Sequence, residues 1–243
     1  MVVSAKVLER WCFTSAVLIC SFTTCQATAI IAVILSDKLY VAADARVSTE
    51  VPGEYRSRCK IVRGSDTCFV SVSAVARYLP TEFDAFLLST PACTAKSIEE
   101  GLKETGSRVK TEFKRAYADA LKNHLDAGAA LMRERGVEIV VSAMEDRPVV
   151  YIQDIWLDDR KGSGDPRRYT LKPDVTNWVL LSGITGEIEN AMNTMPRFRV
   201  PEDLLTVLER QSRVEATVGP PYSILEITKA GHHWLSPGAC PSD

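Results

Sequence analysis

Residues 28–44 read Thr28-Ala-Ile-Ile-Ala-Val-Ile-Leu-Ser-Asp-Lys-Leu-Tyr-Val-Ala-Ala-Asp44, and only Ser36-Asp37-Lys38 separates the two apolar runs. Short apolar runs bounded by turn residues are typical of β-strands, and a polar triplet between two such runs is typical of the turn that joins them. The segment therefore predicts a β-hairpin with a buried face that begins at Thr28.

The segment before Thr28 has the features of a secretory signal peptide. Lys6 and Arg10 make its start weakly basic, residues 11–22 are mostly apolar, and Ala27 is a small residue directly before a cleavage position. The apolar run is short for a bilayer span, which takes about 20 residues. We therefore expect a signal peptide over residues 1–27 that signal peptidase removes, while self-cleavage and an uncleaved signal anchor stay open.

Cleavage at that point would make Thr28 the N-terminal residue of a single domain over residues 28–243. An N-terminal Thr carries a hydroxyl nucleophile and an α-amine that can act as its general base in the same residue. Removal of 27 of the 243 residues leaves 216, which suits one domain with a sizeable core.

Three residues follow Thr28 at separations that point to a known family. Asp44 lies 16 residues after Thr28, Arg46 18 and Lys60 32. In this respect the chain resembles the proteasome β-subunit family of N-terminal-nucleophile (Ntn) hydrolases. The resemblance implies that Thr28, Asp44 and Lys60 are catalytic and that Arg46 supports the Asp44 loop.

The resemblance extends to three later segments. Residues 69–76 match the strand-to-helix turn of the family, with Ala74 where a Gly usually donates its backbone N–H to an oxyanion. Ser182-Gly183 matches part of the family's Gly-Ser-Gly-Ser segment, with Ser182 near the amine of the nucleophile. Glu215 and Val218 replace an Asp and a Ser of the family, so the auxiliary hydrogen bonds around the amine depart from the family pattern.

The implied chemistry explains why these residue types are needed together. The Thr28 hydroxyl attacks a carbonyl carbon, and its own amine, with a reference pKa of about 7.7–8.0, accepts the proton near neutral pH. The Lys60 ammonium disfavours protonation of that amine, and Asp44 holds Lys60 charged and oriented. The Ala74 amide stabilises the oxyanion.

Periodicity along the chain predicts a mixed α and β domain without repeats or a linker. We expect hairpins at 28–44, 137–155 and 222–235, and helices at 74–89, from Ser97 to Ala120, at 186–193 and at 201–211. Ser97-Ile-Glu-Glu100 is a capping box. By resemblance, the fold class is α+β, a four-layer αββα sandwich of the Ntn-hydrolase type.

Four cysteines remain after removal of the signal peptide, at positions 59, 68, 93 and 240. An even number in an exported protein allows up to two disulfides, with three connectivities for full pairing. Cys59 and Cys68 flank the turn at Gly64-Ser65-Asp66, so we favour that pair as a staple across a hairpin, with four buried thiols as the alternative.

Composition argues against several functions. The chain has 29 basic and 31 acidic residues, and loss of residues 1–27 changes the net charge from −2 to −3. This balance gives no support for binding of nucleic acid or of an anionic membrane. The sequence has no metal-spaced His/Cys cluster and no phosphate-loop ending after Gly162, so we expect neither a metal nor a cofactor.

Three functions are compatible with these features. The first is a secreted or periplasmic threonine peptidase that acts on peptide bonds. The second is an amidase or acylase on the same scaffold, because a fold does not fix the substrate. The third is a non-catalytic assembly protein. By resemblance, a homo-oligomeric ring is expected, with 74–89 and the helix from Ser97 as candidate contacts, and no stable membrane span is expected after cleavage.

Overall fold

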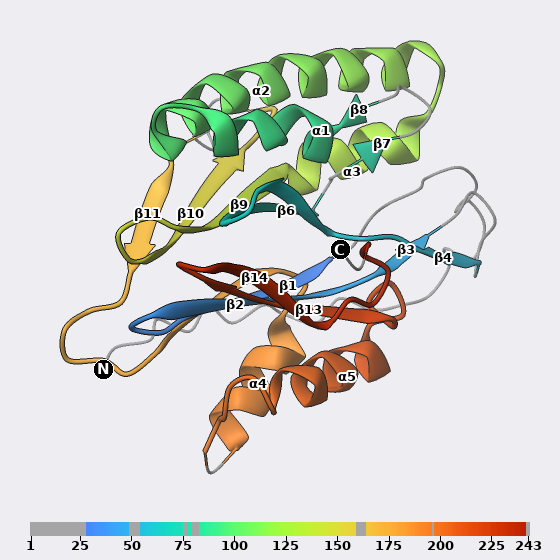
Figure 1. The fold of residues 1–243 in the computed structure, drawn as a ribbon. Helices are drawn as coiled ribbons and strands as arrows, with labels where there is room; N and C mark the ends of the chain where they lie inside the picture. Colours follow the sequence, from blue (N-terminus) through green and yellow to red (C-terminus); the bar gives the residue numbers. More distant parts are fainter. Residues whose placement is uncertain are drawn as a thin grey trace.

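The computed structural model describes residues 28–48, 54–74, 77–78, 83–158, 164–195 and 197–241, so the expected signal peptide lies outside the described residues. Two antiparallel five-stranded sheets form its centre (Figure 1). The first sheet has the order β12 (Trp178–Gly183), β1 (Ala29–Ile34), β2 (Lys38–Asp44), β13 (Tyr222–Thr228) and β14 (Gly231–Ser236). The second has the order β11 (Arg167–Thr170), β10 (Pro148–Ile155), β9 (Val137–Met144), β6 (Cys68–Ala74) and β5 (Ile61–Ser65).

Helices cover the outer face of each sheet (Figure 1). Three helices pack on the second sheet: α1 (Ala85–Ser89), α2 (Ile98–Lys122) and α3 (Asp126–Arg135). Two pack on the first sheet: α4 (Gly186–Thr194) and α5 (Leu204–Val214). Two further pairs of short strands are β3 (Arg46–Ser48) with β4 (Tyr55–Ser57), and β7 (Arg77–Tyr78) with β8 (Phe83–Asp84). The chain is therefore a mixed α and β protein built on antiparallel sheets.

Strand β1 is buried on both of its faces. Ile30, Ala32 and Ile34 lie in the apolar cluster between the two sheets, whereas Ala29, Ile31 and Val33 pack toward α4 and α5. Successive side chains of a strand point to opposite faces, so a continuous apolar run fits a strand that is covered on both sides. The sequence predicts the hairpin correctly but suggests one buried face, where the structure has two.

Most of the expected elements are present. The predicted hairpins are confirmed as β1–β2, β9–β10 and β13–β14. The long helix begins after Ser97, whose side chain accepts a hydrogen bond from the amide of Glu100. Helix α4 occupies nearly its predicted range, and α5 begins three residues later than predicted, at Leu204. Helix α3 and strand β11 are additional elements that the sequence pattern does not indicate.

The predicted helix over 74–89 is confirmed only at its end, as α1, and is wrong at Ala74, Arg77–Tyr78 and Phe83–Asp84, which lie in strands. Ala74 is the last residue of β6, where it pairs with Val137, and Arg77 begins the short strand β7. The helix starts only at Ala85, because Asp84 accepts hydrogen bonds from the amides of the next turn and so caps it. Strand pairing with β9 and the later cap override the local helical pattern. Residues 75–76 and 79–82 lie outside the described ranges.

The expected Cys59–Cys68 disulfide is also wrong. The structure pairs Cys59 with Cys240 and Cys68 with Cys93. The register of the β5–β6 hairpin explains this, since Ile61 lies opposite Ser71 while Cys68 lies opposite Ser65. Cys59 therefore sits at the open end of the hairpin and Cys68 at its turn, roughly five residues or about 17 Å apart along the strand. Two disulfides do form, which is compatible with an extracellular location.

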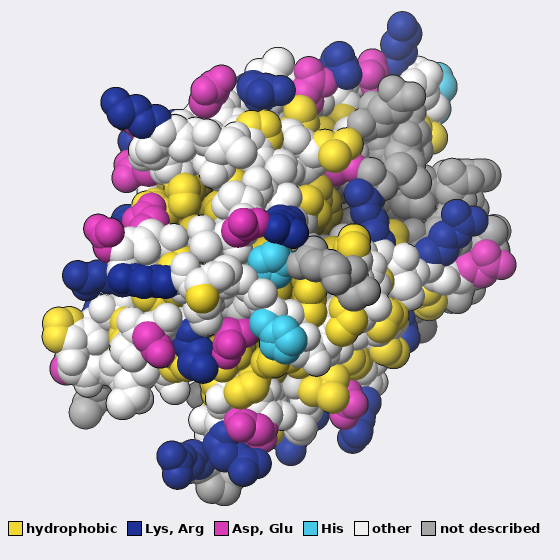
Figure 2. Space-filling model, viewed as in Figure 1, with side chains coloured by type: hydrophobic (Ala, Val, Ile, Leu, Met, Phe, Trp, Pro, Cys, Tyr) yellow, Lys and Arg dark blue, Asp and Glu magenta, His cyan; other side chains and the backbone are white. Residues whose placement is uncertain are grey.

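The visible surface carries charges of both signs. On the face seen in Figure 2, basic and acidic side chains lie interspersed over the elements of both sheets. Within the described ranges, no helix combines the length and the apolar character needed to cross a membrane.

Candidate active site

Asp44 and Lys60 form an ion pair in the interior of the protein. Asp44 ends strand β2, and Lys60 directly precedes β5. The Lys60 Nζ lies 3.1 Å from Oδ1 and 3.0 Å from Oδ2 of Asp44, and both side chains are fully buried. Burial raises the pKa of Asp44, while the Lys60 charge and the amides of Ala29 and Gly219 act in the opposite sense.

The Asp44 carboxylate also binds three backbone amides. Ala29 N donates to Oδ1 at 2.9 Å, whereas Arg46 N and Gly219 N donate to Oδ2 at 3.1 and 3.3 Å. Asp44 Oδ1 thus accepts from both Lys60 and the residue that follows Thr28. This shared atom brings the expected catalytic lysine next to the start of β1.

Thr28 lies at the start of β1 and is fully buried in the intact chain. Its carbonyl oxygen accepts a hydrogen bond from Ile184 N at 2.9 Å. Its Oγ1 has no hydrogen-bond partner among the described residues. Buried hydroxyls are normally hydrogen-bonded, so an unpartnered one is a feature that needs an explanation.

Gly183 allows the close approach of β12 to Thr28. It has φ of +86°, in the region that favours glycine, and a Cβ built on it would overlap the carbonyl oxygen of Thr28. Ser182 precedes it and lies opposite Ile30, which places it diagonally across the ladder from Thr28 on the inner face of the sheet. The expected Ser182-Gly183 pair is therefore beside the start of β1.

The Arg46 side chain reaches the loop after α5 rather than Asp44. Its Nη1 donates to the carbonyl oxygen of Ala216 at 2.8 Å, and its guanidinium lies 4.9 Å from the centre of the Tyr55 ring. It acts on Asp44 through its backbone amide and through the loop that holds Gly219. The supporting role of Arg46 stays a prediction, and the described contacts of its guanidinium are to the loop after α5 and to Tyr55.

Glu215 is engaged within its own turn. Its Oε1 accepts from Thr217 Oγ1 at 2.6 Å and from Thr217 N at 3.2 Å. Val218 is fully buried in the apolar cluster under α5. The segment supplies the amide of Gly219 to Asp44, so its contribution to the site comes from backbone.

Ala74 closes β6 beside Ser73, which contacts the Ser182 hydroxyl. The strand end thus lies near the start of β1, where an oxyanion donor would be needed. Sequence reasoning misses Ser73 and also Glu138, whose Oε1 accepts from Ser73 at 3.3 Å. A signal exists in the sequence, because Glu138 interrupts the otherwise apolar run of residues 137–141.

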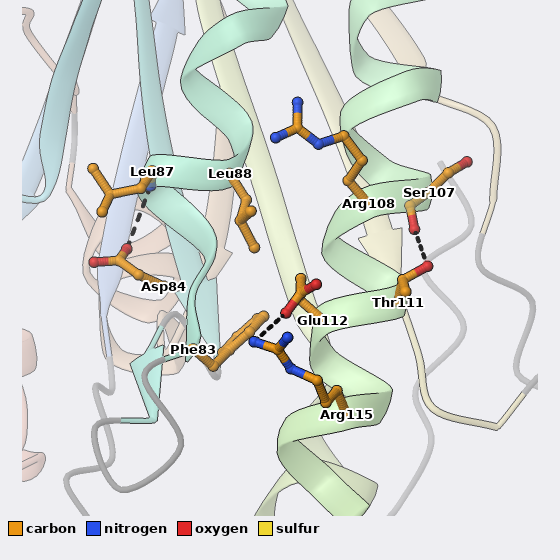
Figure 3. A pocket seen from close by; sticks show the side chains of 9 residues that line it. All are labelled: Phe83, Asp84, Leu87, Leu88, Ser107, Arg108, Thr111, Glu112 and Arg115. Atoms are coloured by element: carbon orange, nitrogen blue, oxygen red, sulfur yellow. Dashed lines mark hydrogen bonds and ion pairs between the residues drawn. The ribbon is translucent and has the colours of Figure 1, made fainter.

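One surface hollow is not lined by the residues of this cluster. A hollow of about 500 Å³ between α1 and α2 is lined by Phe83, Asp84, Leu87, Leu88, Ser107, Arg108, Thr111, Glu112 and Arg115 (Figure 3). Neither Thr28 nor Asp44 lines it. Within the described residues, no group of three or more His, Cys, Asp or Glu side chains has an arrangement that could hold a metal ion.

Comparison with known proteins found no protein-family model and no curated protein that matches the chain.

Proposed function

We propose that the protein is an exported threonine-type peptidase with Thr28 as its N-terminal nucleophile, and that its fold is the four-layer αββα sandwich of the Ntn hydrolases. The observation that carries the proposal is the convergence at Asp44 Oδ1, which accepts hydrogen bonds from Lys60 Nζ and from Ala29 N. The Lys60–Asp44 pair is fully buried and binds the amide of the residue after Thr28, whose hydroxyl has no partner among the described residues. Such a pair has no evident structural purpose, since buried ion pairs contribute little net stability.

In the proposed reaction the freed α-amine of Thr28 takes the proton of Oγ while Oγ bonds to the substrate carbonyl carbon. The tetrahedral oxyanion is stabilised by the backbone amide at Ala74. Collapse of this intermediate breaks the bond to the leaving amine, which takes the proton from the Thr28 ammonium. Water then hydrolyses the ester on Oγ and regenerates the hydroxyl. Lys60 keeps the Thr28 amine unprotonated, and Asp44 fixes Lys60.

The proposed location is secreted or periplasmic. The features of residues 1–27 favour export, and the two disulfides favour an oxidising compartment. Substrates would be peptides, and a homo-oligomeric ring is the proposed assembly.

The first test is the intact mass of the exported protein. A chain that begins at Thr28 is expected, and the Thr28→Ala variant should be trimmed at the same bond, because signal peptidase reads the residues before it. A Thr28→Ala protein that accumulates only as full-length precursor during normal export would show self-processing instead.

The second test is covalent labelling by an electrophile directed at N-terminal threonine, such as a β-lactone, followed by peptide mapping. We expect a stoichiometric ester on Thr28, a labelled Thr28→Ser variant and an unlabelled Thr28→Ala variant. Peptide hydrolysis that the label abolishes supports the peptidase, whereas turnover of simple amides alone would support an amidase or acylase. A correctly trimmed wild-type protein that takes no label would favour the non-catalytic assembly protein.

A further inference from the structure

Three polar side chains form a row across the second sheet. Ser73 on β6 lies directly opposite Glu138 on β9, and Glu138 lies directly opposite Asp154 on β10. Two strand positions away, Val140 and Ile152 belong to the cluster between the sheets, so the row faces the first sheet. Two carboxylates directly opposite each other destabilise a sheet when both are charged. Their presence in this row points to a role.

Hydrogen bonds continue the row to the first sheet. Ser73 Oγ donates to Glu138 Oε1 at 3.3 Å and lies 2.7 Å from Ser182 Oγ, and Ser182 also bonds Glu138. At the other end, Asp154 pairs with Arg167 Nη2 at 2.7 Å. Burial, with a smaller contribution from Asp154, raises the pKa of Glu138. The Arg167 guanidinium serves as the counter-charge of Asp154.

The count of protons gives this network a direction. Each serine hydroxyl has one proton to donate. Ser73 uses its proton on Glu138, so it accepts from Ser182 rather than donating to it. In the direct bond between Ser182 and Glu138, Ser182 is likewise the donor. Whichever bond Ser182 makes, its one proton is directed to the Ser73–Glu138 pair, so toward any further partner its oxygen can only accept.

This direction matters for an amine that must act as a base. An amine has one lone pair, and the Thr28 amine needs it for the proton of its own Oγ. A Ser182 hydroxyl that donated to the amine would occupy that lone pair. A Ser182 oxygen that accepts from an amine N–H leaves it available.

We propose that Glu138 is a positioning residue that acts through Ser73 and Ser182 to orient the Ser182 oxygen as an acceptor toward the Thr28 amine. This inference rests on the proposed function of Thr28. Glu138 has no contact with substrate in this scheme. Its effect is the orientation of one hydroxyl.

The test compares Glu138→Leu with Glu138→Gln in the exported, trimmed protein. Gln can donate its amide N–H to Asp154 and accept from Ser73, so it preserves the direction, whereas Leu removes the acceptor. We expect acylation of Thr28 by the β-lactone to fall about tenfold or more in Glu138→Leu and to stay within about twofold of wild type in Glu138→Gln.

The pH profile separates positioning from a merely structural role. In Glu138→Leu the Ser182 hydroxyl can donate to the neutral amine, which favours the neutral form and lowers the pKa of the amine. The acidic limb of the acylation profile should therefore move to lower pH even though the rate falls. When Ser182→Ala is added to both proteins, the difference between Glu138→Leu and the parent chain should disappear. Saturating reagent should not restore the rate.

These measurements distinguish failure of the Glu138 proposal from failure of the proposed function of Thr28. A wild-type protein that is not labelled at Thr28 would overturn that function and this inference together. If wild type is labelled and Glu138→Leu is acylated at the same rate, the inference alone would be overturned. The same holds if the acidic limb of the acylation profile lies at the same pH in both proteins. If Glu138→Leu does not fold, Glu138→Gln decides, because loss of its acylation would show that charge rather than direction is needed.

Discussion

Asp44 connects parts of the chain that lie far apart in sequence. Its two carboxylate oxygens accept from the start of β1, from the start of β3, from Lys60 and from Gly219. A carboxylate with several charge-assisted hydrogen bonds is a rigid acceptor. The position of Lys60 is therefore fixed by a residue whose own orientation is fixed from three directions.

The buried Lys60–Asp44 pair leads to a prediction about stability. Lys60→Ala should destabilise the fold by about 3–5 kcal/mol, because it leaves the Asp44 carboxylate buried without its counter-charge. The double variant Asp44→Asn with Lys60→Met removes both charges and should lose clearly less. Urea unfolding of the three proteins measures the difference.

The matched readout for this pair is labelling of Thr28. Thr28 should not be acylated in Lys60→Ala or in the double variant, although only Lys60→Ala is strongly destabilised. Equal stability of the two variants would mean that the pair is not held in a dry interior, and normal acylation in the double variant would remove Lys60 from the mechanism.

Substitution of Gly183 should also lower the stability of the protein. Gly183→Ala should be destabilising by about 1–3 kcal/mol from its positive φ alone, with a further loss from overlap with the Thr28 carbonyl. Gly186→Ala is the control, since a Cβ there meets no atom within 4 Å and Ala favours the helix α4 that it begins. Thermal unfolding should separate the two, and a neutral Gly183→Ala would contradict the described approach of β12 to Thr28.

The separation of a residue from Thr28 along the sequence explains which site residues can be predicted. Asp44 and Lys60 lie 16 and 32 residues after Thr28 in one stretch of sequence, and the resemblance to the proteasome β-subunit family implies their role. Glu138 and Ser73 meet only because β6 and β9 pair in one particular register. The spacing of residues along the sequence does not determine the register between strands that are distant in sequence. The role of such residues can therefore be recognised only in the three-dimensional structure.

At the scale of elements, burial pattern and turn residues predict the strands well. The β1–β2, β9–β10 and β13–β14 hairpins each join two apolar runs at a short polar turn. The segment over 74–89 fails because its composition permits a helix while pairing with β9 extends β6 through Ala74. The prediction of a Cys59–Cys68 disulfide is wrong for a similar reason. Tertiary structure brings together the actual partners, which are 181 and 25 residues apart in the sequence.

We predict that removal of each of the two disulfides has a different effect on acylation of Thr28. Cys59 directly precedes Lys60, so the bond to Cys240 holds the strand end that carries the proposed catalytic lysine. Replacement of Cys59 and Cys240 by Ala should reduce acylation of Thr28 and should cost more stability than replacement of Cys68 and Cys93. Entropic estimates give about 3 kcal/mol for a loop of about 15 residues and about 4.7 kcal/mol for one of about 100.

The Cys68/Cys93 double variant is the control for that comparison. Its disulfide joins β6 to the 3₁₀ helix Thr90–Thr94 on the outer face of the second sheet. It should lose stability but acylate Thr28 at nearly the wild-type rate under conditions where it is folded. Equal acylation by both double variants would show that the Cys59–Cys240 bond does not hold Lys60 in place.

At the scale of the molecule, each sheet has one face toward the other sheet and one toward helices (Figure 1). The inner faces enclose the apolar cluster, and the Asp44–Lys60 pair lies where β2 and β5 reach one end of it. Strand ends from both sheets are thus the elements that can place a buried charge beside Thr28. This arrangement is what the resemblance to Ntn hydrolases implies, and it is why we propose their fold.

The last prediction concerns self-association, which the ring proposal requires. Leu87 on α1 is 68% exposed beside the hollow between α1 and α2 (Figure 3), and it is a candidate contact between copies of the chain. A ring needs two unlike faces on each subunit, so a charge at one of them should be enough to disperse it. Light scattering on the trimmed protein at micromolar concentration should give a multiple of the protomer mass, and Leu87→Glu should reduce it to the protomer. Leu205→Glu, at a 40% exposed residue of α5 over the opposite sheet, is the control and should leave the assembly intact. A trimmed monomer that acylates Thr28 and hydrolyses peptides at full rate would contradict the ring and would indicate an enzyme whose single chain provides the complete site.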